Sequence, residues 1–431
     1  MEIEKLNEWN PWWEKLEVTS ELKGRSRKSY NLLLKSINVK EITIITGVRR
    51  SGKSTLMYQM IDSLLKKGIA PQQILFINCE DKKLIHDSLD DLYLSYRQYL
   101  NIDKKAYIFL DEIQRKEGWE LWIRKKYDLK SNDKFIISGS SSHLLKKEYS
   151  TLLTGRNITF EVFPLSFEEF LFFHNIEIDK AKLRKGIILE TTKIKILKYL
   201  RDYLNFGGFP EVLTKASDFK IKLLEQYFDD IIYKDIVDRY DLNAQKTRDI
   251  TLFFMTSITS LISLRNIRNV LKIAYDTVKE YLSYCKEAFL IFTLEHFSYS
   301  YKEQKTRASK VYCIDNGLRN AVSFKFSEDR GKLIENLTFL ELKRRSKKIY
   351  YWKNKNEVDF IIKNKDNSLS ALNVTDADEI NKREISGLMD FKKEFKIKTK
   401  DLIILTRNIE KSEGGIIFMP LWKWLLIYEE N

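Results

Sequence analysis

Nine consecutive residues in the first part of the chain have the types and spacing that bind the phosphates of a nucleotide. They are Gly47, Val48, Arg49, Arg50, Ser51, Gly52, Lys53, Ser54 and Thr55, of which the first eight match the pattern G-x-x-x-x-G-K-[ST]. The glycines permit backbone angles and close approaches that side chains would block, so the loop's N–H groups can surround a phosphate. Lys53 can neutralise β- and γ-phosphate oxygens, and the Ser54 hydroxyl can ligate Mg²⁺.

The segments on either side of this loop predict a strand before it and a helix after it. Residues 42–46 are apolar and β-branched, as in a buried strand. In residues 54–67, apolar side chains at Leu56, Met60 and Leu64 fall on one face of a helix, whose N-terminus adds a positive dipole end. The alternative is an ordinary glycine turn before a helix. The order of strand, loop and helix favours the phosphate loop instead.

Two adjacent carboxylates supply the second half of a nucleotide site. Residues 107–112 predict a third strand that ends in Asp111 and Glu112, after a second strand at residues 74–79. Asp111 can hold Mg²⁺ through water, and Glu112 can polarise an attacking water. Strands often end in acidic residues, but a position about 60 residues after a phosphate loop favours the catalytic interpretation.

Ser140 and Arg156 are further candidates for the same site. Ser140 ends a predicted fourth strand at residues 134–140, and its hydroxyl either senses the γ-phosphate or caps a turn. Arg156 is placed either to act as an arginine finger in a neighbouring subunit or to remain a solvated surface side chain. Strands that alternate with helices predict an α/β fold with a parallel sheet and a ligand at the carboxyl ends of its strands.

Length, composition and charge narrow the class of protein. The 431 residues suffice for two or three domains, and no stretch reaches the ~20 apolar residues of a membrane-spanning helix. Three scattered cysteines and a polar start of the chain predict a reducing, cytoplasmic setting. Lys and Arg exceed Asp and Glu by 75 − 61 = 14, which favours a nucleic-acid partner, although a lysine-rich genome gives the same excess.

Several motifs occur in the order found in one family of proteins. They are residues 47–55, 109–114, 137–141 and 154–156, followed by residues 203–211, 233–236, 313–318 and 357–360. Over nearly the whole chain they resemble the prokaryotic, archaeal-type predicted ATPases of the AAA+ superfamily. The resemblance implies ATP as the nucleotide, and it places Ser140 at the sensor position and Arg156 at the finger position.

Four domains are predicted along the chain. The AAA+ core spans residues 1–165, and residues 166–245 resemble its helical lid, starting with a capping pattern of Ser166 and Glu169. Residues 246–325 predict a winged-helix-like module, which binds either DNA or a protein. Its expected parts are a short helix that includes Ile267 and Val270, a break at residues 275–276, a helix at residues 277–289 and a strand.

Residues 326–431 resemble a restriction-endonuclease-like domain. They predict a helix followed by three strands, at residues 349–352, 357–362 and 370–375, with acidic residues Glu335 and Asp359. A basic run at residues 343–348 either holds a DNA backbone or is a solvated helix end.

The third of these strands lacks the groups that nuclease chemistry needs. A carboxylate and a lysine spaced as Glu-x-Lys ligate the metal and activate water, and this chain has Asn373 and Thr375 there. Asp376 and Asp378 are close in sequence, but strand alternation points them differently. We therefore expect the nuclease-like fold to be degenerate, without strong nuclease activity.

The sequence thus predicts a Mg²⁺-dependent, ATP-binding P-loop ATPase of the AAA+ superfamily that is coupled to DNA binding. Lys53 and the loop bind the phosphates, Ser54 and Asp111 hold Mg²⁺, and Glu112 orients water. A finger role for Arg156 implies a homo-oligomer. Two alternatives remain open: a nucleotide-dependent switch that docks a protein partner, and an ATP-regulated nuclease.

Overall fold

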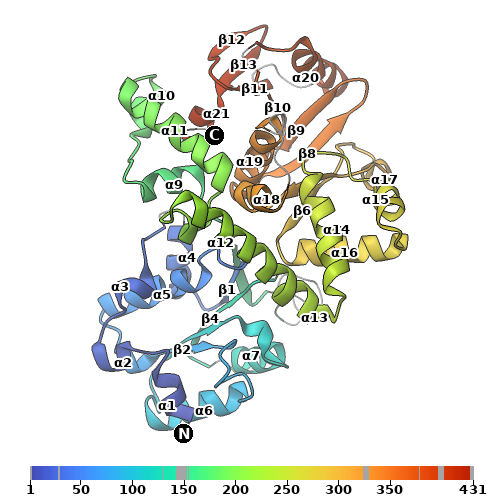
Figure 1. Cartoon of the computed structure of the whole chain (residues 1–431). Helices are drawn as coiled ribbons and strands as arrows, with labels where there is room; N and C mark the ends of the chain where they lie inside the picture. Colours follow the sequence, from blue (N-terminus) through green and yellow to red (C-terminus); the bar gives the residue numbers. More distant parts are fainter. Residues whose placement is uncertain are drawn as a thin grey trace. The chain divides into compact units, whose positions relative to one another are not determined.

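The computed structural model describes residues 2–27, 30–129, 131–141, 153, 155–323, 330–377, 379–396 and 402–427. Two compact units are present: Met1–Phe163 with the short segment Glu287–Phe289, and the rest of the chain (Figure 1). The finer division into four domains stays a prediction. Thr154, in the motif at residues 154–156, and Asp378 lie outside the described residues. Among the residues that are described, no helix is long and apolar enough to cross a membrane.

The first unit is built on a parallel five-stranded sheet with the order β2-β3-β4-β1-β5. Its strands are β1 (Ile42–Thr46), β2 (Ile74–Asn78), β3 (Tyr107–Asp111), β4 (Lys134–Gly139) and β5 (Asn157–Glu161). The predicted α/β fold with a parallel sheet is confirmed. Because all strands run the same way, the carboxyl ends of β1, β3 and β4 meet at one edge.

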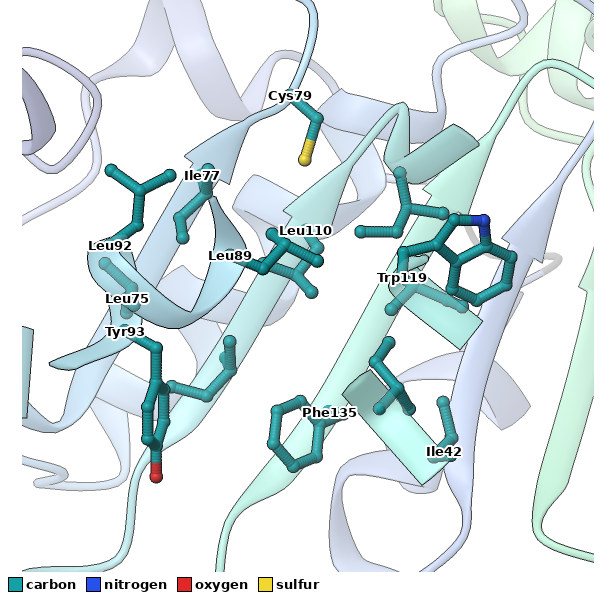
Figure 2. Packing of buried hydrophobic residues seen from close by; sticks show 14 of the residues in the cluster. Ile42, Leu75, Ile77, Cys79, Leu89, Leu92, Tyr93, Leu110, Trp119 and Phe135 are labelled. Carbon is teal, nitrogen blue, oxygen red and sulfur yellow. The ribbon is translucent and has the colours of Figure 1, made fainter. Parts of the chain in front are cut away.

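Helices cover both faces of this sheet (Figure 1). They are α1 (Glu2–Asn7), α2 (Trp12–Lys15), α3 (Ser20–Lys23), α4 (Asn31–Lys35), α5 (Lys53–Lys66), α6 (Leu89–Tyr99) and α7 (Trp119–Asp128), with 3₁₀ turns at Ser36–Asn38, Pro71–Gln73 and Ile113–Arg115. Strand alternation sends Ile44 to one face and Ile45 to the other. Figure 2 shows the first face, where α6 and α7 meet the sheet through Leu89, Leu92, Tyr93, Trp119, Leu75, Ile77, Leu110 and Phe135.

The N-terminal segment closes the free edge of β2, an outer strand of the sheet. The fully buried Asn10 pairs with the backbone of Phe76: its Nδ2 donates to the carbonyl oxygen at 2.8 Å, and its Oδ1 accepts the N–H at 2.7 Å. The indole N–H groups of Trp12 and Trp13 donate to the Ile74 carbonyl oxygen at 3.2 and 2.9 Å. Side chains therefore occupy the place where a further strand would otherwise pair.

The second unit begins with helices. They are α9 (Phe167–Phe173), α10 (Lys180–Arg184), α11 (Glu190–Phe206), α12 (Ser217–Asp230), a π-helix (Ile231–Val237), α13 (Asp238–Tyr240), α14 (Ala244–Thr256), α15 (Leu264–Leu271), α16 (Tyr275–Glu287), α17 (Tyr301–Thr306) and α18 (Asn316–Val322), with a 3₁₀ turn at Pro210–Val212. The predicted capping pattern is confirmed at α9. The Ser166 hydroxyl accepts the Glu169 N–H at 3.2 Å, and the Glu169 carboxylate accepts the Ser166 N–H at 3.0 Å.

The order of helix, helix and strand expected for residues 265–297 is present, with one difference. Helix α16 begins at Tyr275, so the predicted break at residues 275–276 is wrong; the chain turns just before, where Lys272 adopts a left-handed conformation. In the helix before this turn, Ile267 is buried and Val270 is 58% exposed. Strand β6 (Ile291–Leu294) then pairs in antiparallel fashion with β7 (Lys310–Cys313).

A mixed six-stranded sheet with the order β12-β13-β11-β10-β9-β8 forms the C-terminal part of this unit. Its elements are α19 (Arg330–Arg344), β8 (Lys348–Lys353), β9 (Glu357–Lys363), β10 (Leu369–Val374), α20 (Lys382–Phe395), β11 (Leu402–Thr406), β12 (Lys411–Glu413), β13 (Ile416–Pro420) and α21 (Leu421–Ile427). The three strands predicted here correspond to β8, β9 and β10. Helix α20 packs on this sheet through Leu388 and Phe391.

Two of the motifs noted in the sequence pack against each other inside the second unit. Gly207 has a φ of +71°, and a Cβ at this position would lie 1.9 Å from Oδ1 of Asp315. The Asp315 carboxylate accepts the N–H groups of Gly208 at 2.7 Å and Leu318 at 3.0 Å. Burial raises the pKa of Asp315 to about 6, against the effect of these hydrogen bonds. The motifs at residues 203–211 and 313–318 therefore join α11 to α18.

Replacing Asn10 with Ala should loosen the edge of the first sheet. Two buried backbone groups of Phe76 would lose their partner, which costs about 2 kcal/mol or more and speeds amide exchange at least roughly thirtyfold. Hydrogen exchange over residues 74–78, followed by mass spectrometry, measures this. Asn7→Ala is the matched control, because the Asn7 side chain bonds the exposed Glu14 carboxylate; equal exchange in both variants would contradict the capping role.

Candidate nucleotide-binding site

The predicted phosphate loop connects β1 to α5 at the carboxyl edge of the first sheet. A side chain at Gly47 would place its Cβ 2.1 Å from the Val162 carbonyl oxygen, and Gly52 begins α5 with a φ of +98°. Lys53 Nζ donates to the carbonyl oxygens of Gly47 and Val48, at 3.1 and 3.2 Å. The lysine is thus folded back over its own loop, as phosphate binding requires.

Asp111 and Glu112 lie at the carboxyl end of β3, beside the loop. The Ser54 hydroxyl donates to Asp111 Oδ2 at 2.6 Å, and Lys53 Nζ lies 3.4 Å from Glu112 Oε1. Ser138, on β4, donates to Asp111 Oδ1 and accepts the Glu112 N–H at 3.1 Å. Glu112 has a left-handed backbone, with φ 51° and ψ 47°, a conformation that is costly for this residue type and that clusters at functional sites.

The two carboxylates differ in their electrostatic surroundings. Burial and the adjacent Glu112 raise the pKa of Asp111, although Ser138 and Ser54 donate hydrogen bonds to it. Burial also acts to raise the pKa of Glu112, but the positive charges of Lys53 and Arg49 outweigh burial and lower that pKa to about 2. Glu112 therefore carries a negative charge at neutral pH and can accept a hydrogen bond from water.

Ser140 lies beside Glu112, one of the two adjacent carboxylates. Its backbone N–H donates to Glu112 Oε2 at 3.1 Å, and Gln114 Nε2 donates to the Ser140 hydroxyl at 3.3 Å. Gln114 also bonds the Glu112 carboxylate. Ser140 and Gln114 thus hold Glu112 in place, and the sensor role of the Ser140 hydroxyl stays a prediction.

Arginines brace the loop from two sides. The buried Arg27 donates through Nη1 to the carbonyl oxygens of Ser51 and Phe163, both at 3.0 Å. Arg49, inside the loop, forms a two-point contact with the Glu80 carboxylate at 3.2 and 3.1 Å. Arg115 approaches the same carboxylate at 3.3 Å. The loop is therefore held to the N-terminal segment by Arg27 and to the end of β2 by Arg49.

Arg156 lies far from the loop of its own unit. Its carbonyl oxygen accepts the N–H of Ile42, the first residue of β1, whereas the phosphate loop follows the last residue of that strand. Five strand residues separate the two ends, which is about 16 Å. The Arg156 guanidinium instead pairs with Asp128, with Nε 2.9 Å from Oδ1. The structure thus brings together the other predicted catalytic residues and leaves Arg156 outside.

The residues at the loop fit the phosphates and Mg²⁺ of a nucleoside triphosphate. Lys53 and Ser54 begin α5, where free backbone N–H groups and the helix dipole favour an anion. Ser54 and Asp111 offer oxygen ligands of the kind that Mg²⁺ takes together with phosphates and water. No group of three or more His, Cys, Asp or Glu in the described part of the chain could hold a metal, so we expect Mg²⁺ to enter with the nucleotide.

The structure also places the residues of the predicted nuclease-like site. Glu335 of α19 and Asp359 of β9 come together, since both contact the ammonium of Lys310, at 3.0 and 3.1 Å. Asn373 is a brace: its Oδ1 accepts the Asp359 N–H, and its Nδ2 donates to the Glu384 carbonyl oxygen, both at 3.0 Å. The N–H of Thr375 pairs with the backbone of β11.

Basic and acidic side chains near this site also have structural partners. Asp376 pairs with Arg330 and Arg407, each at 3.0 Å. In the basic run, Arg344 donates to the Pro164 and Leu165 carbonyl oxygens, and Arg345 pairs with Glu341 at 2.9 Å. These two arginines are engaged inside the second unit, which weakens the hypothesis that the run holds a DNA backbone.

Three residues with roles at these sites were not found from the sequence. A role for Ser138 could have been suspected, because its hydroxyl follows the apolar residues of β4, and β4 is the strand next to β3. Arg27 offered no signal, since its partners are 24 and 136 residues away. Lys310 offered one: a lysine within the apolar segment at residues 310–314 must be paired if that segment is a buried strand.

Comparisons with known proteins bear on this arrangement. A family model described as an AAA domain matches residues 39–171. Residues 197–329 and 330–424 match two domains of unknown function, DUF8612 and DUF4143. An uncharacterized protein of Methanocaldococcus jannaschii is 35% identical, over 90% of this chain and 89% of that protein. An uncharacterized protein of Haemophilus influenzae is 30% identical, over 93% of this chain and 98% of that protein.

The chain belongs to the family of these proteins. Its AAA domain covers the phosphate loop, the acidic pair and Ser140, so the AAA+ and nucleotide-binding expectations are confirmed. The restriction-endonuclease likeness and the archaeal type stay predictions, because the second unit matches only domains of unknown function.

Two solved structures also share features with this chain. AMPPCP-bound DnaA from Aquifex aeolicus covers 64% of this chain and 92% of its own, with 14% identity and a TM-score of 0.28. RIF2 from Saccharomyces cerevisiae covers 53% and 88%, with 13% identity and a TM-score of 0.26. Likeness at this level carries no functional information for this AAA-domain protein.

Replacing Arg27 with Ala should weaken nucleotide binding without removing any residue expected to touch the nucleotide. The variant loses two charge-assisted hydrogen bonds that hold the loop, and we expect an affinity about tenfold lower. Calorimetric titration with a non-hydrolysable ATP analogue measures the change. Arg25→Ala is the matched control, because its side chain is exposed two residues away. Unchanged affinity in Arg27→Ala would show that the loop keeps its shape without the brace.

Proposed function

We propose that this AAA-domain protein hydrolyses ATP with Mg²⁺ and that DNA binding is coupled to hydrolysis. The observation that carries the proposal is the convergence of Lys53, Ser54, Asp111 and Glu112. The Ser54–Asp111 hydrogen bond of 2.6 Å and the Lys53–Glu112 separation of 3.4 Å bring the groups of α5 and β3 to one place. Phosphate binding and water activation need these groups side by side.

Each side chain then has a distinct task. Lys53 exchanges its carbonyl partners for phosphate oxygens, and the start of α5 adds N–H donors. Ser54 and Asp111 would hold Mg²⁺, which neutralises charge on the phosphates when it is bound. Glu112 stays ionised and orients the attacking water, while Ser138, Gln114 and the Ser140 N–H fix its position.

DNA is the partner that charge and layout favour. The chain carries a net charge of +14. Helices α14, α15 and α16 followed by the β6–β7 hairpin support a winged-helix-like module, and Arg265, Arg268 and Lys272 are exposed at α15. Because Arg344 and Arg345 are used internally, we assign the DNA contact to α15. Free thiols at Cys79, Cys285 and Cys313 agree with the cytoplasmic setting expected for such an enzyme.

Oligomerisation follows if Arg156 completes a site. The guanidinium lies at the opposite end of β1 from the loop, so it cannot serve the phosphates of its own unit in this arrangement. It is partly exposed and pairs with Asp128 at the surface. We propose that it reaches the site of a neighbouring subunit in a homo-oligomer.

ATP hydrolysis by the purified protein should rise when double- or single-stranded DNA is added. Glu112→Gln should still bind ATP but turn over at least about a hundredfold more slowly, and Lys53→Ala should lose binding. Phosphate release measures turnover, and a fluorescent ATP analogue measures binding. Arg265→Ala with Arg268→Ala should keep the basal rate and lose the stimulation.

Glu117→Gln is the matched control, since this glutamate is exposed five residues after Glu112 and should leave turnover unchanged. Normal turnover by Glu112→Gln would show that the catalytic assignment is wrong. A slow basal rate that ignores DNA would remove the DNA coupling and favour the nucleotide switch with a protein partner.

The finger role of Arg156 has its own test. Lys53→Ala and Arg156→Ala should each be inactive alone, and mixing them in equal amounts should restore about a quarter of the sites, if subunits exchange freely. In such sites one subunit supplies the loop and its neighbour supplies the arginine. Mixing Lys53→Ala with Glu112→Gln is the control and should restore nothing, because both defects fall in one subunit's site. No recovery in the first mixture would contradict a finger acting between subunits.

A further inference from the structure

Lys310 is a buried cation among three carboxylates in the second unit. Its side chain is only 2% exposed, and its Nζ lies 2.7 Å from Glu357 Oε1, 3.0 Å from Glu335 Oε1 and 3.1 Å from Asp359 Oδ1. The lysine comes from β7, and the carboxylates come from α19 and β9. An ammonium has three N–H donors, so these three acceptors satisfy it completely.

Electrostatics keeps this ammonium charged. Burial acts to lower the pKa of Lys310, but the negative charges of Asp359, Glu335 and Glu357 outweigh burial and hold that pKa well above its usual value. On the other side, burial and Asp359 raise the pKa of Glu335 to about 7, although Lys310 opposes them. The carboxylates therefore depend on Lys310 for compensation.

Other contacts fix the direction of each carboxylate. Glu335 accepts the Tyr312 hydroxyl at 2.7 Å, and Glu357 Oε2 lies 2.8 Å from Lys353 Nζ. Asp359 Oδ2 accepts the Val374 N–H at 3.0 Å, and its own N–H is held by Asn373. Three oxygens are thus aimed at one point from a rigid sheet and a helix.

We propose that the Lys310 ammonium takes the place of a divalent cation in the C-terminal domain. Several carboxylate oxygens converging on one positive charge form the donor set that Mg²⁺, Mn²⁺ or Ca²⁺ prefers. The contacts of 2.7 to 3.1 Å are those of an ammonium and exceed the 2.0–2.1 Å typical of Mg²⁺–oxygen bonds. With Lys310 in place, these three carboxylates do not form a metal site, and the described residues contain no group of three or more His, Cys, Asp or Glu that could hold a metal.

Lys310 comes from a part of the chain outside the domain whose carboxylates it neutralises. The lysine belongs to the β6–β7 hairpin, outside the segment at residues 330–424 that forms the matched C-terminal domain. The hairpin therefore supplies from elsewhere in the chain the charge that the Asn373–Thr375 strand does not. Removing the ammonium leaves Glu335, Glu357 and Asp359 around one buried point, where a divalent cation can restore the balance.

Mn²⁺ binding to the full-length chain without nucleotide tests the proposal. Titration followed by electron paramagnetic resonance counts the Mn²⁺ ions bound per chain. The wild-type protein gives the baseline number, which includes any ion held by Ser54 and Asp111. Lys310→Met, whose side chain is one atom shorter and uncharged, should bind one additional Mn²⁺ and should melt at a higher temperature with Mn²⁺ than without. Lys310→Arg, which keeps the charge, should bind no additional ion.

The Lys310→Met/Asp359→Asn double variant should lose the additional Mn²⁺, which would locate it at these carboxylates. A folded Lys310→Met protein without extra Mn²⁺ overturns the proposal. So does a Lys310→Met protein that stays unfolded with and without Mn²⁺ while Lys310→Arg folds, because the cation then cannot replace the ammonium. Loss of Mn²⁺ from wild type upon Asp359→Asn also overturns it, since Lys310 would then not fill the site.

Discussion

The two hydrogen bonds that Asp111 accepts from hydroxyl groups hold the candidate site together. Ser54 comes from α5 and Ser138 from β4, so this one carboxylate at the end of β3 ties three elements that are distant in sequence. Strand β4 lies between β3 and β1 in the sheet, and Ser138 links β4 to the end of β3 through Asp111. The same hydroxyl accepts the Glu112 N–H, which links the acid expected to carry Mg²⁺ with the acid expected to orient water.

Two buried lysines show how differently a protein can neutralise a cation. Lys53 is only 3.4 Å from one carboxylate and otherwise donates to two carbonyl oxygens of its loop. The carbonyl oxygens carry no net charge, so a negatively charged phosphate can replace them and interact more strongly with Lys53. Lys310 contacts three carboxylates at hydrogen-bond distance and has no donor to spare. One lysine is therefore poised for an anion, and the other is saturated.

The sequence predicted those structural features that are determined by residues close together along the chain. The strands at β1, β3 and β4 and the helix α5 follow from local periodicity, and the loop from a motif with a fixed spacing. Contacts between distant segments were not accessible: Asn10 seals Phe76, Arg27 reaches Ser51, and Lys310 reaches Asp359. The start of α16 was misjudged, because the turn before it depends on the left-handed backbone of Lys272, which the residue types do not reveal.

Asn10 and the two tryptophans cover the edge of β2, and as a result the folding unit extends beyond the region that matches the AAA family model. The AAA match begins at residue 39, yet the strand at residues 74–78 is completed by side chains from residues 10–13. A fragment cut at the homology boundary would carry an open strand with unpaired N–H and C=O groups, ready to join another copy. The smallest autonomous form of this AAA-domain unit therefore begins before Asn10, and the N-terminal helices belong to its folding unit.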